Sequence, residues 1–218
     1  MSSQVQPNDG ASGLLNLVAG ASDYEDQYFL IGQMLARVRT TTLVQVISCT
    51  NDGGVSPVGL VDVKVLVQRM DGAGNVIDAG TVHNVPYFRV QGGTNAIIMD
   101  PQPGDIGLAC ISDRDISAIK ASKTAAAPGS VRRHDMADAL YIGGVLNGAP
   151  AQYIQFTDAG IKLVSPTKVT IEAPSGAFNI NDMEITGATL KHNGVNIGST
   201  HTHGGVLTGP AHTLTPDP

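Results

Sequence analysis

The chain has 218 residues, 42% of them hydrophobic, and a formal net charge of −6 from 13 basic and 19 acidic side chains. This hydrophobic content is enough for a packed core, so a wholly disordered chain is excluded. No run of Lys or Arg is long enough to neutralise a row of phosphates, and we expect no nucleic-acid partner. No signal-peptide pattern or membrane-spanning window is present, so we expect a soluble protein made in the cytoplasm.

Composition favours an all-β fold. The sequence holds 26 glycines, no tryptophan and only 4% aromatic residues, and Val, Ile and Thr recur in short alternating runs. Cys49 and Cys110 lie in separate apolar runs without a CxxC spacing, so we expect two reduced core thiols rather than a disulfide or a catalytic cysteine.

Residues 1–39 are expected to form an N-terminal arm with one helix. In YEDQYFLIGQMLARV, residues 24–38, apolar side chains recur every three or four residues on one face. Ser22 or Asp23 is the expected N-cap. The helix either packs on its own domain or serves as a docking arm for a neighbouring protein.

From residue 40 the hydrophobic period changes to two, which is typical of strands. Five or six antiparallel strands within 40–117 predict a small barrel resembling the oligonucleotide/oligosaccharide-binding fold, because closure removes exposed sheet edges. The turns expected between the strands are NDGG, DGAGN, NVP, QGG and PQPG. The predicted strands are TTLVQVISC, VGLVDVKVLVQRM, NVIDAGTV, PYFRVQ, NAIIMD and DIGLACIS.

Two motifs in this region invite a catalytic or binding interpretation. DGAGN lacks the GK[ST] ending of a phosphate loop and lies where a hairpin turn is expected. Asp113 and Asp115 flank an arginine that offsets their charge, so a neutralised turn is favoured over a catalytic carboxylate pair. Residues 118–152 are expected to be a connector, with an ordered turn rather than a helix around Pro128.

Residues 153–200 are expected to form short strands that leave one face apolar and the other polar. The predicted strands are YIQFT, IKLVS, KVTIEA, AFNIN, MEITGA and VNIGSTHTH. The apolar pairs are Ile161/Leu163, Val169/Ile171, Phe178/Ile180, Met183/Ile185 and Val195/Ile197. These strands carry too few large side chains for a free-standing sheet, which favours several identical chains wound around one axis.

His201 and His203 are the candidate metal ligands. On an uninterrupted strand both side chains keep the parity of Val195 and Ile197, so both point toward the axis. Three chains then present six imidazole nitrogens in two layers, an octahedral donor set that suits Fe(II), Ni(II) or Co(II) better than zinc. The alternative is that HTH belongs to a frayed, solvated terminus. His83, His134 and His212 are interpreted as surface or core histidines, and parity does not place His192.

Three long runs and the C-terminal HTHGGV carry a resemblance to a known family. SPVGLVDVKVLVQRMDGAGNVI, NVPYFRVQGGTNAIIMDPQPGDIGLACISDRDIS and PGSVRRHDMADALYIGG resemble the N-terminal part of the central, membrane-piercing baseplate spike proteins of contractile-tailed bacteriophages. The Gly-Pro and short Thr/Pro tail after HTHGGV resemble the apex of the same family.

The resemblance implies a homotrimer with three parts: the barrel near the tail hub or tube proteins, an intertwined triple-stranded β-helix shaft, and a pointed metal-binding apex formed by 201–218. One iron ion per trimer would be held by His201 and His203 of each chain. The implied role is structural: the spike caps the tail tube of the virion and pierces the host outer membrane on sheath contraction. A small tip protein is a further possible partner. No enzymatic activity is implied.

Two other functions remain open at this stage. A trimeric, fibre-like adhesin recognising a cell-surface sugar would need exposed aromatic side chains, and none follows Phe178. A metal hydrolase using HTH would need an open coordination position, which six histidines do not leave. The tail after Gly205 is expected to fold back over the tip, with prolines keeping it out of the strand ladder.

Overall fold

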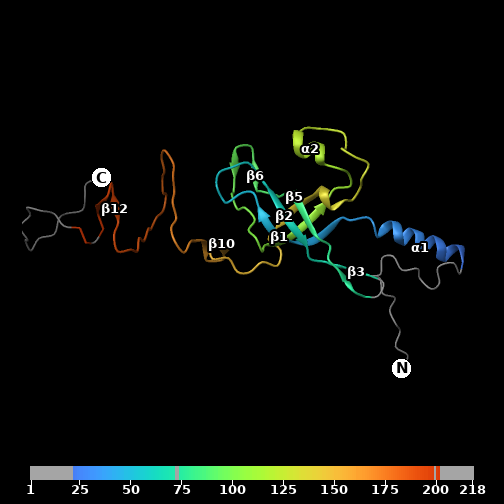
Figure 1. Ribbon diagram of the computed structural model, residues 1–218. Helices are drawn as coiled ribbons and strands as arrows, with labels where there is room; N and C mark the ends of the chain where they lie inside the picture. Colours follow the sequence, from blue (N-terminus) through green and yellow to red (C-terminus); the bar gives the residue numbers. More distant parts are fainter. Residues whose placement is uncertain (1–21, 72–73, 199, 202–218) are drawn as a thin grey trace, which may run out of the picture. The chain divides into compact units, whose positions relative to one another are not determined.

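A computed structural model describes residues 22–71, 74–198 and 200–201, which divide into two compact units after Ala151 (Figure 1). The described residues are mostly β with few helices, as the composition predicted. The helices are α1 (Asp23–Leu35), α2 (Ser117–Ser122) and the 3-10 turn η1 (Met136–Asp138). The strands of the N-terminal unit are β1 (Thr41–Cys49), β2 (Leu60–Val65), β3 (Arg69–Met70), β4 (Val76–Ile77), β5 (Thr81–Pro86), β6 (Gln91–Gly92), β7 (Asn95–Ala96), β8 (Ile106–Ile111) and β9 (Ala139–Gly143). The C-terminal unit holds β10 (Tyr153–Thr157), β11 (Gly160–Val164), β12 (Lys191–His192) and β13 (Val195–Asn196).

The N-terminal unit is built on one curled antiparallel sheet of five strands in the order β5-β2-β1-β8-β9. The two ends of the sheet approach each other, because Tyr87, directly after β5, forms a parallel bridge with Tyr141 of β9. The backbone N–H of Phe88 donates to the Tyr141 carbonyl at 2.8 Å. The sheet is therefore a half-barrel whose edges are tied together, which limits its exposed edge groups.

The core of this unit follows the two-residue period of the sequence. Val44 and Val46 of β1 face Val63 and Val65 of β2, and all four are buried. Gly107 of β8 lies so close to the Tyr141 ring that a Cβ would sit 2.6 Å from a ring carbon, so only glycine fits there. Cys49 and Cys110 are free and half-buried, which confirms the expectation of unpaired thiols.

The segment NVP was predicted to be a turn, and this prediction was wrong. Val85 and Pro86 belong to β5, and Asn84 is accommodated by a register shift between Val61 and Val63 of β2. Asn84 has a φ of 58° and its N–H donates to the Asp62 carboxylate at 3.0 Å. A left-handed Asn thus produces a bulge within the strand rather than ending it.

The segment 118–152 is more ordered than the expected connector. It begins within α2, which ends before the turn expected around Pro128, and continues through η1 into β9. β9 pairs with β8 over its whole length, from Gly107 opposite Gly143 to Ile111 opposite Ala139. The sheet therefore extends past residue 117, and its fifth strand was not foreseen because ALYIG is short and follows a loop rich in Ser, Gly and Arg.

A buried ion cluster holds this loop against the sheet. Arg132 donates through Nε to Asp138 at 2.7 Å and through Nη2 to Asp115 at 3.0 Å, and both carboxylates are buried. Hydrogen bonds from Ser117 and Ser130 lower the pKa of Asp115 to about 2. The pKa of Asp138 is also lowered, chiefly by its hydrogen bond from Arg132. Asp113 instead pairs with Arg114 at 3.6 Å on the surface, so the two carboxylates of the DRD motif serve separate ion pairs.

Helix α1 begins where the sequence indicated, but none of its side chains is buried by the described part of the chain. The Ser22 side chain accepts a hydrogen bond from the N–H of Glu25 at 3.3 Å, which confirms Ser22 as the N-cap. The helix ends at Leu35, three residues earlier than the apolar periodicity suggested, and contains no buried residue. No helix within the described ranges is long and apolar enough to cross a membrane.

Acid is expected to release the loop that Arg132 clamps. The folded-state pKa values of Asp115 and Asp138 lie below the ordinary carboxyl value of 3.8, so the unfolded state binds more protons as the pH falls. The stabilisation is complete above about pH 4 and is lost progressively toward pH 2. Replacing Arg132 with Met is expected to move the acid-unfolding midpoint, followed by circular dichroism, to a higher pH.

The matched control is Arg114→Met, because Arg114 forms only an exposed ion pair. Its acid-unfolding midpoint should equal that of the unmodified protein. Equal midpoints for Arg132→Met and Arg114→Met would show that the cluster does not contribute to acid stability.

Candidate functional site: the apolar C-terminal unit and His201

The first hairpin of the C-terminal unit has one fully apolar face. β10 and β11 pair in a register that sets Ile154 opposite Leu163 and Phe156 opposite Ile161. Residues directly opposite each other share a face, so these four side chains form one patch. All four are more than half exposed, with Phe156 at 74%. Within the described part of the chain, the apolar face of this hairpin is therefore exposed.

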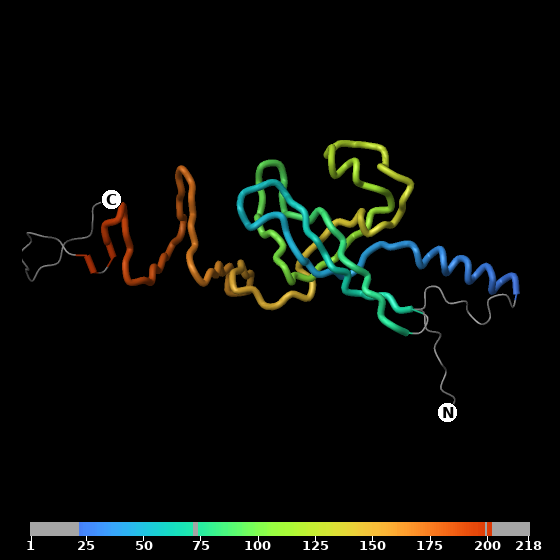
Figure 2. The backbone as a smooth tube through the Cα atoms, in the orientation of Figure 1, coloured from blue at the N-terminus to red at the C-terminus, as the bar shows by residue number. Residues whose placement is uncertain are grey.

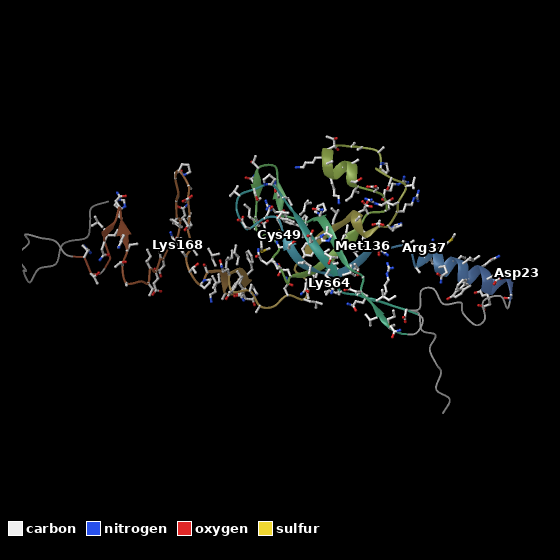
Figure 3. The ribbon with its side chains drawn as sticks, in the orientation of Figure 1. Asp23, Arg37, Cys49, Lys64, Met136 and Lys168 are labelled. Carbon is white, nitrogen blue, oxygen red and sulfur yellow. The ribbon has the colours of Figure 1, made fainter. Side chains whose placement is uncertain are left out.

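The same exposure continues along residues 165–190, where the backbone is extended and turns back on itself (Figure 2). Figure 3 shows side chains around Lys168 projecting from this extended backbone. The large apolar side chains of the stretch other than Leu190 are at least half exposed: Val169, Ile171, Phe178, Ile180, Met183 and Ile185. The strands predicted over 168–173, 177–181 and 183–188 are absent from this part of the described chain, because their backbone groups find no ladder partner within it.

The second hairpin carries the chain toward the histidines. β12 and β13 pair His192 with Val195, and the turn residues Asn193 and Gly194 have φ values of 48° and 82°. Two successive positive φ values match a type I′ turn, for which Asn-Gly is the preferred sequence. The hairpin is prolonged by a 2.6 Å hydrogen bond from Ile197 N–H to the carbonyl of Leu190.

A turn separates β13 from His201, so the parity argument for the histidines does not hold as stated. β13 ends at Asn196, and the N–H of His201 donates to the carbonyl of Gly198 at 3.1 Å. The strand was expected to run uninterrupted from Val195 to His203, and the alternation of side chains cannot be counted across a turn. His203 lies outside the described residues.

The imidazole of His201 contacts a backbone carbonyl of the preceding turn. Its Nδ1 lies 2.6 Å from the Gly198 carbonyl oxygen. A carbonyl only accepts, so this hydrogen bond requires a proton on Nδ1, and in a neutral imidazole the lone pair is then on Nε2. Metal-ligating histidines commonly donate their second nitrogen to a backbone carbonyl in this way, which orients the ring and raises its basicity. The donor chemistry of His201 therefore fits a metal ligand that coordinates through Nε2.

A metal site within one chain has no support in the described part of the molecule. Among those residues no three His, Cys, Asp or Glu side chains gather closely enough to hold an ion. His83 instead pairs with Asp62 at 2.9 Å, and His134 contacts the Arg39 carbonyl at 3.1 Å. His192 contacts the Asn193 amide at 3.2 Å. His212 lies outside the described residues.

Asn196 is a positioning residue that the sequence pattern alone did not single out. Its Oδ1 accepts from the N–H of Gly198 at 3.0 Å, and its Nδ2 donates to the Thr200 hydroxyl at 2.8 Å. Both bonds hold the turn that carries His201. The signal was present in the sequence, because an Asn two residues before a Gly often caps a turn through its own side chain.

The N-terminal unit presents a second apolar surface, on the ribbon formed by β6 and β7. Gln91 pairs with Ala96 and the N–H of Ile97 donates to Val90 at 2.9 Å. Continuing this register places Phe88 opposite Met99 on the same face. The exposed members of this ribbon patch are Phe88, Val90, Ile97 and Met99.

A buried charge pair fixes the inner face of the ribbon. Arg89 donates to Asp100 at 2.5 Å and to the carbonyl of Ser56 at 2.6 Å, and the side chains of Arg89 and Asp100 are almost fully buried. Burial by itself raises the pKa of Asp100, but hydrogen bonds from the Tyr87 hydroxyl and the guanidinium outweigh it and leave that pKa lowered. The patch is thus presented on a rigid base, since breaking a buried ion pair is costly.

These features define a β-rich protein with a self-contained half-barrel unit and a C-terminal unit that exposes its apolar side chains. Residues 55–144 match the family described as the phage protein Gp138 N-terminal domain. The match ends one residue after β9, so the matched segment includes the fifth strand of the sheet. No curated protein matches the chain. The family match indicates a phage protein and suggests a structural component of the virion.

Replacing Asn196 with Ala is expected to loosen the turn before His201. Each lost hydrogen bond contributes about 1 kcal/mol, so the Gly198 amide should exchange with solvent roughly five- to tenfold faster. Hydrogen exchange followed by NMR or mass spectrometry measures this. Asn179→Ala is the matched control, since Asn179 is exposed in the same unit. Unchanged exchange in Asn196→Ala would remove Asn196 from the support of His201.

Proposed function

We propose that three copies of this chain assemble into the central baseplate spike of a contractile-tailed phage. The observation that carries the proposal is the exposed apolar alternation of the C-terminal unit, in which every large aliphatic or Phe side chain from Ile154 to Ile197, apart from half-buried Val164, is at least 41% exposed. A stable monomer rarely leaves so long an apolar surface in water. Identical chains around a three-fold axis bury it while pairing each other's free backbone groups.

An intertwined triple-stranded β-helix accounts for the unpaired segments of residues 165–190. Their side chains alternate with the period of a strand, but a strand needs a neighbour to satisfy its N–H and C=O groups. Neighbouring chains supply that partner in the proposed shaft. The same residues then form ladders between chains instead of within one chain.

At the apex we propose one iron ion held by His201 and His203 of all three chains. Six neutral imidazole nitrogens form a complete octahedral set, with no position for a substrate or a reactive water. The ion would cross-link three chain ends, and its role is structural. The hydrogen bond from His201 Nδ1–H to Gly198 supports this use of His201.

The proposed role is mechanical and requires no enzymatic activity. The N-terminal unit, which carries the phage family match and the ribbon patch, is the part that we assign to the tail hub or tube proteins. The shaft and apex are assigned to contact with the host outer membrane when the sheath contracts. The virion is accordingly the proposed location of the protein.

Ile171→Asp is expected to break the trimer. Ile171 belongs to the proposed inward face, and a carboxylate buried there without a partner costs several kcal/mol in each chain. Light scattering should find the unmodified protein at three times the 22.5 kDa chain mass and Ile171→Asp at a lower mass.

Thr170→Asp is the matched control, because Thr170 is the neighbouring residue of opposite parity and should remain in water. It is expected to stay trimeric. A monomeric unmodified protein contradicts the proposed function, and equal disruption by both variants contradicts the assigned inward face.

Replacing both His201 and His203 with Ala is expected to remove iron while the N-terminal unit stays folded. Elemental analysis of the unmodified trimer should give about one iron per three chains, and the double variant should give close to none. Circular dichroism checks that the barrel is intact. An unchanged iron content in the variant would place the ligands elsewhere, and trimers that never contain a transition metal would overturn the metal proposal.

A further inference from the structure

Helix α1 carries a broad apolar side that nothing in the described part of the chain covers. Figure 3 shows side chains projecting along this helix between the labelled Asp23 and Arg37. Its large apolar side chains are each more than half exposed: Tyr24, Tyr28, Leu30, Ile31, Met34 and Leu35. The half-buried residues of the helix are Glu25, Phe29 and Gln33, which follow one another at intervals of four on the opposite side.

The apolar residues have the spacing of a coiled-coil seam. Tyr24, Tyr28, Ile31 and Leu35 are separated by four, three and four residues, and Val38 continues the series by three. When apolar residues alternate at intervals of four and three, they form one stripe along the helix. This stripe can stay in contact with a neighbouring helix that has the same repeat. The stacked rings of Tyr24 and Tyr28, 6.4 Å apart, lie on this stripe.

The charged residues are placed so that parallel copies can approach. The positions beside the seam are Glu25, Gln27, Gly32 and Met34, of which only Glu25 is charged. Asp26 lies away from the seam, and so does Arg37 beyond the helix end. No like-charged pair is therefore forced together across the seam, and Met34 and Leu30 widen the apolar stripe beyond the minimum for two helices.

We propose that the α1 helices of three copies pack side by side as a short parallel three-helix bundle, with the Tyr24–Leu35 stripe of each helix facing the other two. This inference rests on the proposed trimer and adds a second, N-terminal contact to it. A membrane surface fits the helix less well, because its first turn is acidic and its last turn has no basic residue.

The length of the helix explains why the bundle needs the rest of the trimer. Isolated helices shorter than about 12–15 residues are marginal in water, and α1 has 13 residues. Three helices tied to one assembly meet at high effective concentration, which offsets the cost of bringing them together. The bundle thus clamps a trimer that the C-terminal units have formed.

Cysteine cross-linking of the full-length protein tests this arrangement. Ile31→Cys places a thiol on the seam, whereas Gln33→Cys places one on the opposite side of the same turn. Two cysteines bridge only when their Cα atoms lie within about 7 Å, so mild oxidation should give at least about tenfold more covalent dimer for Ile31→Cys than for Gln33→Cys. The unmodified protein gives the background from Cys49 and Cys110.

Light scattering on the same samples separates the two proposals. Trimers in which Ile31→Cys gives no more dimer than Gln33→Cys would overturn the helix bundle while leaving the trimer intact; this is also the result expected if α1 docks on a different protein. Monomers of the unmodified protein would overturn the proposed function and the bundle with it. Trimers with selective Ile31→Cys cross-linking would support both proposals.

Discussion

The C-terminal unit depends on one constraint: its apolar side chains alternate along the chain, and the described part of the chain leaves them exposed. The face formed by Ile154, Phe156, Ile161 and Leu163 is exposed even where a hairpin satisfies the backbone. Farther along, residues 165–189 form no strand within the described chain, and their large apolar side chains are at least half exposed. Exposed apolar side chains and backbone groups without strand partners both cost free energy. Neighbouring copies of the same chain can bury the side chains and pair the backbone groups at once. Assembly is therefore the central element of the proposed function.

The N-terminal unit buries its alternating apolar side chains within its own sheet. Its valines alternate with the same period, but the sheet curls until Tyr87 meets Tyr141, so the apolar face closes on itself. Two buried charge clusters, around Arg89 and around Arg132, then fasten the loops to the sheet. Such pairs add geometric definition more surely than net stability, because desolvation offsets much of their attraction. The fastened sheet presents the exposed ribbon patch, and helix α1, which contains no buried residue, adds a second exposed apolar surface to the N-terminal unit.

Much of the fold was predictable from the sequence because it depends on local periodicity. β1 and β10 have the predicted bounds, the N-cap of α1 is Ser22, and the turn at Asn193–Gly194 has the dipeptide that a type I′ turn prefers. The failures occurred where a contact distant in sequence decides the conformation. Asn84 stays within β5 because Asp62 of the adjacent strand accepts its N–H, and β9 is a strand because β8 offers it an edge.

The candidate site shows the same division. The sequence by itself determined the donor types, the HTH spacing and the alternation of apolar residues, because these are properties of covalent order and side-chain chemistry. Only the tertiary structure decided that a turn after Asn196 interrupts the parity, that Gly198 orients the His201 ring, and that α1 leaves its apolar stripe uncovered. The physical reason is that a hydrogen bond or a buried face requires a partner in space, and a pattern of single residues cannot specify where that partner lies.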